Sequence, residues 1–127
     1  MPTLNAIAPC FPVADVGAII RWYEDKLGFK GNAFPEVEPY VFAILFRERV
    51  EIMLQRIEGF AKADLYAQRN GGVWDAYLRV SGVKEFYESV RAEVTIMRPL
   101  RLQPYGSWEF EVKDPNGYVL VFSEAAG

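Results

Sequence analysis

Hydrophobic residues recur over residues 16–27 at the spacing of one face of a helix. Asp15 precedes this stretch and Gly28 follows it. A carboxylate just before the first turn can accept a backbone N–H, and glycine after the last turn readily adopts left-handed backbone angles. The pattern therefore predicts a helix over 16–27. Its apolar positions are Val16, Ile19, Ile20, Tyr23 and Leu27.

A second amphipathic stretch predicts a helix over 82–92, with Ser81 directly before it. Its opposite face is charged, as expected of a surface in contact with water. The apolar stripe consists of Val83, Phe86, Tyr87 and Val90, and the charged face of Lys84, Glu85, Glu88 and Arg91.

The other apolar segments are short and bounded by turn residues, as strands are. Residues 114–117, Asp-Pro-Asn-Gly, form a reverse-turn sequence. Residues 118–122 are apolar on both faces of a strand, so both faces must be covered. Residues 58–71 are expected to link two halves of the chain and to contain a short helix. The predicted strands are 4–13, 29–34, 40–46, 50–56, 73–80, 94–100, 107–113 and 117–123.

The two halves of this pattern repeat each other. Val13 and Val80 lie 67 residues apart, and the apolar positions of the two predicted helices have the same separation. The following strands have the same 67-residue separation, because Val41, Ala43 and Leu45 match Trp108, Phe110 and Val112. Each half therefore predicts one strand, one helix and three further strands.

Composition narrows the possible chemistry. The chain has 127 residues, a size typical of one domain, and a formal net charge of −3 without a basic run, which argues against nucleic-acid binding. It contains no histidine, so any chemistry must use carboxylates, Tyr, Lys or Arg. Cys10 is the only cysteine. No signal peptide or membrane span is evident, and a cytoplasmic protein is expected.

Four stretches together carry a family resemblance: FPVADVGAIIRWYEDKLGF (11–29), YVFAILFRERVEIMLQR (40–56), YLRVSGVKEFYESVRA (77–92) and VKDPNGYVLVF (112–122). They resemble the vicinal oxygen chelate superfamily, which includes glyoxalase I, extradiol dioxygenases and bleomycin resistance proteins. The resemblance implies an α+β fold in which two βαβββ modules form a cupped mixed sheet around a cavity. A single domain is expected, with module 1 over about 1–57, a linker over about 58–71 and module 2 over about 72–127.

The family's metal-dependent enzymes hold a cation with four side chains inside the cup. Carried over residue by residue, these positions are Ala8, Met53, Asp75 and Val121. Only Asp75 offers an oxygen ligand, and a divalent ion needs several donors. The resemblance therefore shifts toward the bleomycin resistance protein, which binds its ligand without metal or turnover, and no cofactor is expected.

Strand alternation around these positions predicts the residues that line the cup. Carboxylates dominate, and Arg79 is the only cation among them, so a flat, partly apolar cation is the favoured ligand. The alternative is that the carboxylates are solvated or paired with Arg79, Arg47, Arg49 and Arg56. The predicted ligand-binding residues are Glu51, Met53, Asp75, Tyr77, Arg79, Trp108, Glu109, Glu111 and Val121. The aromatic residues favoured for a pocket or an interface are Trp74, Trp108, Tyr40, Tyr66 and Tyr105, although Trp108 also fits a core position.

Two classes of function remain open. The favoured one is a metal-free, homodimeric binding protein that sequesters a cationic aromatic compound such as a bleomycin-type antibiotic. The rival is a metal-independent isomerase or lyase with Glu111 or Asp75 as general base and Tyr77 or Arg79 stabilising an oxyanion. A weaker version of the rival uses Mg²⁺ or Mn²⁺ held by Asp75, Glu51 and Glu111. A homodimer is expected because family members build each cavity from both chains. Pro9 resembles a feature that helps them exchange the first strand, and the alternative is an ordinary proline on an edge strand.

Overall fold

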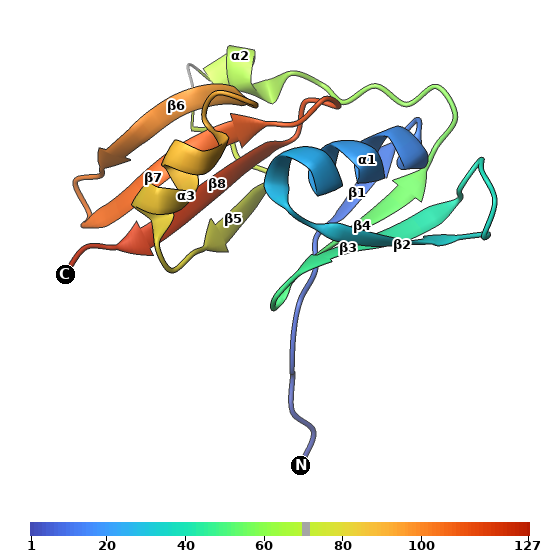
Figure 1. The fold of residues 1–127 in the computed structure, drawn as a ribbon, viewed down its shortest axis with the longest axis horizontal. Helices are drawn as coiled ribbons and strands as arrows, with labels where there is room; N and C mark the ends of the chain where they lie inside the picture. The colour runs from blue at the N-terminus through green and yellow to red at the C-terminus, as the bar shows by residue number, and fades with distance from the viewer. Residues whose placement is uncertain (70–71) are drawn as a thin grey trace. The chain divides into compact units, whose positions relative to one another are not determined.

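The computed structural model describes residues 1–69 and 72–127 and divides the chain into two compact units, Met1–Ala61 and Lys62–Gly127 (Figure 1). Unit 1 contains β1 (Cys10–Val13), α1 (Val16–Leu27), β2 (Lys30–Phe34), β3 (Phe42–Arg47) and β4 (Val50–Arg56). Unit 2 contains α2 (Leu65–Arg69), β5 (Ala76–Arg79), α3 (Val83–Val90), β6 (Thr95–Leu102), β7 (Ser107–Lys113) and β8 (Val119–Ala125).

Both units have the same sheet topology, as the repeat predicts. The strand orders are β1-β4-β3-β2 and β5-β8-β7-β6, and in each sheet the first pair is parallel and the others antiparallel. The registers also agree, because Cys10 pairs with Met53 in unit 1 and the corresponding Tyr77 pairs with Val121 in unit 2. The α+β class and the βαβββ repeat are confirmed.

Helix α1 has the predicted bounds because local signals fix both of its ends. Asp15 Oδ1 accepts the backbone N–H of Ala18 at 3.1 Å, and Gly28 has a φ of 70° and donates its N–H to the Tyr23 carbonyl. In Figure 1 the helix lies along one face of the unit 1 sheet. Its five predicted apolar positions are all buried, and they form the core of unit 1 with Ala43, Leu45, Ile52 and Leu54.

Helix α3 is shorter than predicted and is capped differently. It begins at Val83 with Gly82 as the N-cap residue, so the expected helix over 82–92 and its apparent start after Ser81 are corrected. The Glu124 carboxylate, from the end of β8, accepts the N–H groups of Gly82 and Val83 at 3.0–3.1 Å. The first turn of α3 is therefore capped by Glu124, which is distant in sequence, and not by a neighbouring side chain.

Aromatic packing attaches α3 to its sheet. The Phe86 and Tyr87 rings contact Phe110 on β7 at centroid distances of 6.0 and 5.0 Å, and Phe86 also contacts Phe122 on β8 at 5.0 Å. Because side chains alternate along a strand, the neighbours of Phe110 on β7 point to the opposite face. The helix thus covers one face of the unit 2 sheet, and β7 presents other residues on its second face.

The first strand is shorter than its prediction. It covers Cys10–Val13 rather than 4–13, and Leu4 and Ile7 are fully exposed. The Pro9 carbonyl accepts the N–H of Met53 at 2.9 Å, but Pro9 has no N–H of its own, so the regular ladder begins only after it.

The turn at 114–117 forms as predicted. The Asp114 carboxylate accepts the N–H groups of Asn116 and Tyr118, and Gly117 has a φ of 94°. No helix within the two described stretches is long and apolar enough to cross a bilayer.

The Glu124 cap makes the stability of unit 2 depend on pH. Its hydrogen bonds from Val83 and Gly82 lower the pKa of the carboxyl below the ordinary value. The resulting stability is present above the unfolded-state pKa and is lost as the pH falls through the folded-state pKa. We expect Glu124→Gln to lower the thermal midpoint at pH 7, with the difference from wild type closing toward pH 3. Circular dichroism melts measure this, with the exposed Glu58→Gln as control. A difference that persists at pH 3 would contradict the charged cap.

Candidate functional site

The second face of β7 carries two buried carboxylates. Glu109 is 3% exposed and Glu111 is 4% exposed, and both face away from the α3 side, where Phe110 and Val112 are buried. Removing a carboxylate from water costs several kcal/mol unless donors replace its hydration. The donors that satisfy these two residues therefore define the site.

Glu111 receives donors from segments far from it in the chain. Tyr66 in α2 donates its hydroxyl to Oε1 at 2.9 Å, and Trp74 donates its indole N–H to Oε2 at 3.0 Å. Arg98, the partner of Glu111 on β6, brings Nε to 3.9 Å from Oε2. Both oxygens of Glu111 are thus engaged, mainly by neutral donors.

Glu109 has a matching pair of tyrosines. Tyr77 on β5 donates its hydroxyl to Oε2 in a short hydrogen bond, and Tyr105 in the β6–β7 turn donates to Oε1 at 2.6 Å. The Tyr77 hydroxyl also lies 3.4 Å from that of Ser107. We call Tyr66, Trp74, Tyr77, Tyr105, Glu109 and Glu111 the acidic–aromatic cluster.

Burial and the carboxylates of the cluster both raise the pKa values of two of its tyrosines. Burial of the hydroxyl, reinforced by its hydrogen bond to Glu109, raises the pKa of Tyr105 to about 12. Burial and then the Glu111 hydrogen bond likewise raise the pKa of Tyr66. Both tyrosines therefore stay neutral at physiological pH and remain hydrogen-bond donors.

Several rings of the cluster keep an exposed surface above the buried carboxylates. Trp74, Tyr77 and Tyr105 are all exposed, Tyr105 most of all at 63%. The Trp74 and Tyr77 rings lie 5.6 Å apart, and the Arg79 guanidinium sits 5.3 Å from the Tyr77 centroid. A cation is thus already stacked on the rim of this surface, as the quadrupole of an aromatic ring favours.

Asp75 has its own partners beside the cluster. Its Oδ2 accepts the N–H of Val119 at 2.8 Å and lies 3.4 Å from Lys62 Nζ. The same ammonium is 5.4 Å from the centroid of the Tyr118 ring. Asp75 is therefore engaged by one backbone donor and one lysine.

The predicted ligand-binding residues are distributed over both units. Unit 2 brings together Asp75, Tyr77, Arg79, Glu109, Glu111 and the buried Val121. Glu51 is exposed and Met53 half-buried on β4 of unit 1. Trp108 lies on the α3 face of β7, opposite the carboxylates, with Lys84 Nζ 4.1 Å from its ring.

The alternative of solvated or arginine-paired carboxylates holds for only part of the set. Glu51 is exposed, as that alternative expects. Glu109 and Glu111 are buried against tyrosine and tryptophan donors, and the arginine near Glu111 is Arg98, which is not one of the four arginines named. Sequence reasoning missed Lys62, Arg98 and Tyr118. Once β6 and β7 are paired, their register places Arg98 opposite Glu111. No pattern in the sequence around Lys62 indicates that it contacts Asp75.

The residues at the four metal-ligand positions of the family do not fit a divalent ion. Ala8 and Val121 offer no donor, Met53 offers only a thioether, and the Asp75 carboxylate is engaged by Val119 and Lys62. Within residues 1–69 and 72–127 no three His, Cys, Asp or Glu side chains are grouped as metal ligands. The all-carboxylate site from Asp75, Glu51 and Glu111 would draw on both units and stays a prediction.

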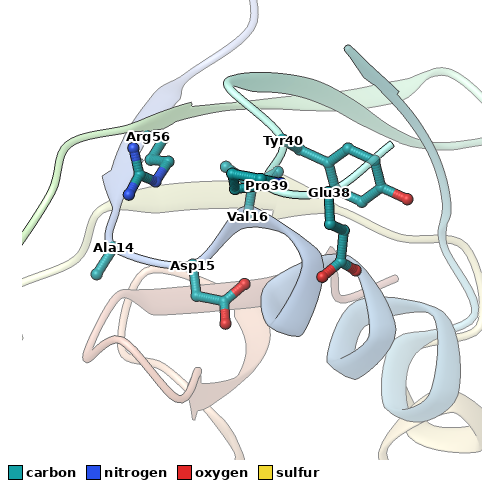
Figure 2. A pocket seen from close by; sticks show the side chains of 7 residues that line it. All are labelled: Ala14, Asp15, Val16, Glu38, Pro39, Tyr40 and Arg56. Atoms are coloured by element: carbon teal, nitrogen blue, oxygen red, sulfur yellow. The ribbon is translucent and has the colours of Figure 1, made fainter. Parts of the chain in front are cut away.

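Unit 1 has a separate hollow at the start of α1 (Figure 2). It has a volume of about 390 Å³, and Tyr40 and Arg56 border it together with Asp15 and Glu38. Glu38 is already paired with Arg21 at 2.7 Å. Of the residues favoured from sequence, only Tyr40 is among its lining residues: Ala14, Asp15, Val16, Glu38, Pro39, Tyr40 and Arg56.

Two βαβββ units with identical strand order define a class of protein built by duplication of one module. The sequence pattern of the glyoxalase/bleomycin resistance protein/dioxygenase superfamily matches residues 3–122, and the chain belongs to this superfamily. None of the curated protein sequences compared with the chain matches it.

Solved structures share the fold at low sequence identity. TioX from Micromonospora sp. ML1 is 21% identical with a TM-score of 0.72, covering 97% of this chain and 98% of its own. The bleomycin-binding protein of Streptomyces verticillus, solved with copper(II)-bleomycin, is 23% identical with a TM-score of 0.70, covering 100% and 99%. A glyoxalase-related enzyme from Clostridium phytofermentans is 15% identical with a TM-score of 0.77, covering 98% and 97%. These likenesses show the fold.

The cluster makes a prediction about the titration of Tyr105. We expect its ring to titrate at about pH 12 in the folded protein, and Glu109→Gln to move that pKa down toward the ordinary value of about 10. The ¹³Cζ resonance of labelled tyrosine, assigned with Tyr105→Phe, reports it. Glu51→Gln, on unit 1, is the control and should leave the titration unchanged. An unshifted Tyr105 in the wild type would contradict the Glu109 contact.

Proposed function

We propose that the protein binds and sequesters a small cationic aromatic compound, of the bleomycin type, without a metal ion. The observation that carries this proposal is the acidic–aromatic cluster, in which two buried carboxylates are satisfied mainly by neutral tyrosine and tryptophan donors, with Arg98 as a more distant cation 3.9 Å from Glu111. Such donors stabilise the anions without cancelling their charge. The cluster therefore keeps a negative potential beneath exposed aromatic rings, and this combination suits a flat cation.

The resemblance to bleomycin-binding structures supports the choice of ligand class. The Streptomyces verticillus structure contains copper(II)-bleomycin, and the bleomycin resistance determinant of transposon Tn5 has the same fold with a TM-score of 0.71 and 20% identity, covering 96% of this chain and 98% of its own. Bleomycin is therefore the first compound to test. The expected homodimer and cytoplasmic location stay predictions.

The hydrogen bonding of the carboxylates favours binding over the rival isomerase or lyase. A general base needs an oxygen free to take a proton within reach of substrate. In Glu111 each oxygen already accepts a hydrogen bond, and Asp75 Oδ2 is shared by Val119 and Lys62. These contacts already occupy both oxygens of Glu111 and one oxygen of Asp75, where a general base would have to take up the proton.

Isothermal titration calorimetry with bleomycin, metal-free and as the copper(II) complex, tests the proposal. We expect a dissociation constant of about 1 μM or lower, equivalent to roughly 8 kcal/mol of binding free energy. Weak or absent binding of both forms would exclude bleomycin as the ligand. Native mass spectrometry of the purified protein would add the subunit number and any retained compound, and one tightly bound divalent ion per subunit would contradict the metal-free proposal.

Glu109→Gln tests whether the buried charge provides the affinity. Both partners of Glu109 are hydroxyls, which can accept as well as donate, so a glutamine amide can be satisfied in the same place. We expect bleomycin binding to weaken about tenfold or more through loss of one buried charge. The matched control is Glu85→Gln on α3, which removes an exposed charge from the helix side of the same unit. Equal effects of the two variants would point to net charge rather than to the cluster.

A further inference from the structure

Lys62 is an unusually buried lysine. Its side chain is only 11% exposed, and lysines are rarely buried unless they are paired. Its ammonium lies 3.4 Å from Asp75 Oδ2, 5.4 Å from the Tyr118 centroid and 3.2 Å from the Ala63 carbonyl. A carboxylate, an aromatic face and a carbonyl oxygen are together a complete set of contacts for an ammonium ion.

Asp75 and Tyr118, which contact the Lys62 ammonium, are held in place without help from Lys62. The Asp75 N–H donates to the Val119 carbonyl at 2.8 Å, and Asp75 Oδ2 accepts the Val119 N–H at 2.8 Å. Tyr118 is buried directly after the 114–117 turn, and its N–H donates to Asp114 at 3.0 Å. Asp75 and Tyr118 are thus positioned by the β5–β8 pair and by the turn.

The segment that supplies Lys62 is held more loosely. Residues 62–69 pair with no strand, and α2 buries none of its side chains. Besides Lys62, Tyr66 links this segment to the sheet through its hydrogen bond to Glu111 and an interaction with Arg98 on β6. Few buried contacts mean a low free energy of local opening.

We propose that Asp75 and Tyr118 form an ammonium-binding subsite that Lys62 fills until a ligand ammonium replaces it. This inference rests on the proposed function, because the subsite would hold the cationic end of the ligand. The residue next to Asp75, Trp74, donates to Glu111, so the subsite adjoins the acidic–aromatic cluster. A compound with an alkylammonium group beside an aromatic ring would reach both. Lys62 then acts as a built-in competitor that excludes weak or neutral compounds.

Phenethylammonium chloride tests the subsite directly, with neutral phenethyl alcohol as the matched compound. We expect Lys62→Met to bind phenethylammonium at least about tenfold more tightly than wild type, because no internal cation competes for Asp75. The Val119 amide in a ¹H–¹⁵N spectrum reports occupancy, since it donates to Asp75. Phenethyl alcohol should leave that amide unshifted in both proteins. Lys62→Arg keeps the positive charge and should bind phenethylammonium as weakly as the wild type does.

Lys84→Met is the control variant, because Lys84 also stacks on an aromatic ring of unit 2 but on the α3 face. It should bind phenethylammonium as wild type does. No shift at Val119 in folded Lys62→Met, or equal affinity in wild type and Lys62→Met, would overturn the subsite. Bleomycin titration of the same variants separates the two proposals. If no variant binds bleomycin but phenethylammonium still shifts the Val119 amide, the result refutes bleomycin as the ligand and leaves the subsite standing.

Discussion

The burial of Glu109 and Glu111 on one strand is the constraint on which unit 2 depends. Each carboxylate loses its water, so the chain must bring donors to it from elsewhere. The donors come from α2, from the segment before β5, from β5 itself and from the β6–β7 turn. Two charges on β7 thereby fix the positions of four separate segments, and an unsatisfied carboxylate would destabilise all of them.

The two halves of the repeated fold differ at the positions of these carboxylates. At the positions of Glu109 and Glu111, unit 1 has Phe42 and Ile44, which are half-buried. The strand order and register are nevertheless the same in both units. The shared topology therefore does not require the carboxylates, which position segments in unit 2 only.

Neutral donors give the site its chemical character. Tyrosine and tryptophan donors stabilise Glu109 and Glu111 without neutralising them, and Arg98, 3.9 Å from Glu111, compensates only part of the charge. Burial, and after it the hydrogen bonds to Glu111 and Glu109, raise the pKa values of Tyr66 and Tyr105. Arg79 over Tyr77 and Lys62 over Tyr118 show that aromatic faces of this unit already attract the chain's own cations.

The sequence by itself determined the elements whose signals are local. Asp15 and Gly28 fixed both ends of α1, Asp114 to Gly117 fixed the β7–β8 turn, and the 67-residue repeat fixed the shared topology. Alternation along β7 also separated Glu109 and Glu111 from Phe110. Only the tertiary structure decided which partners these residues have. Glu124 caps α3 from 41 residues away, Tyr66 reaches Glu111 across 45, and Lys62 meets Asp75 from a segment without periodicity. Such pairings depend on how distant segments pack, and that leaves no pattern in the neighbouring sequence.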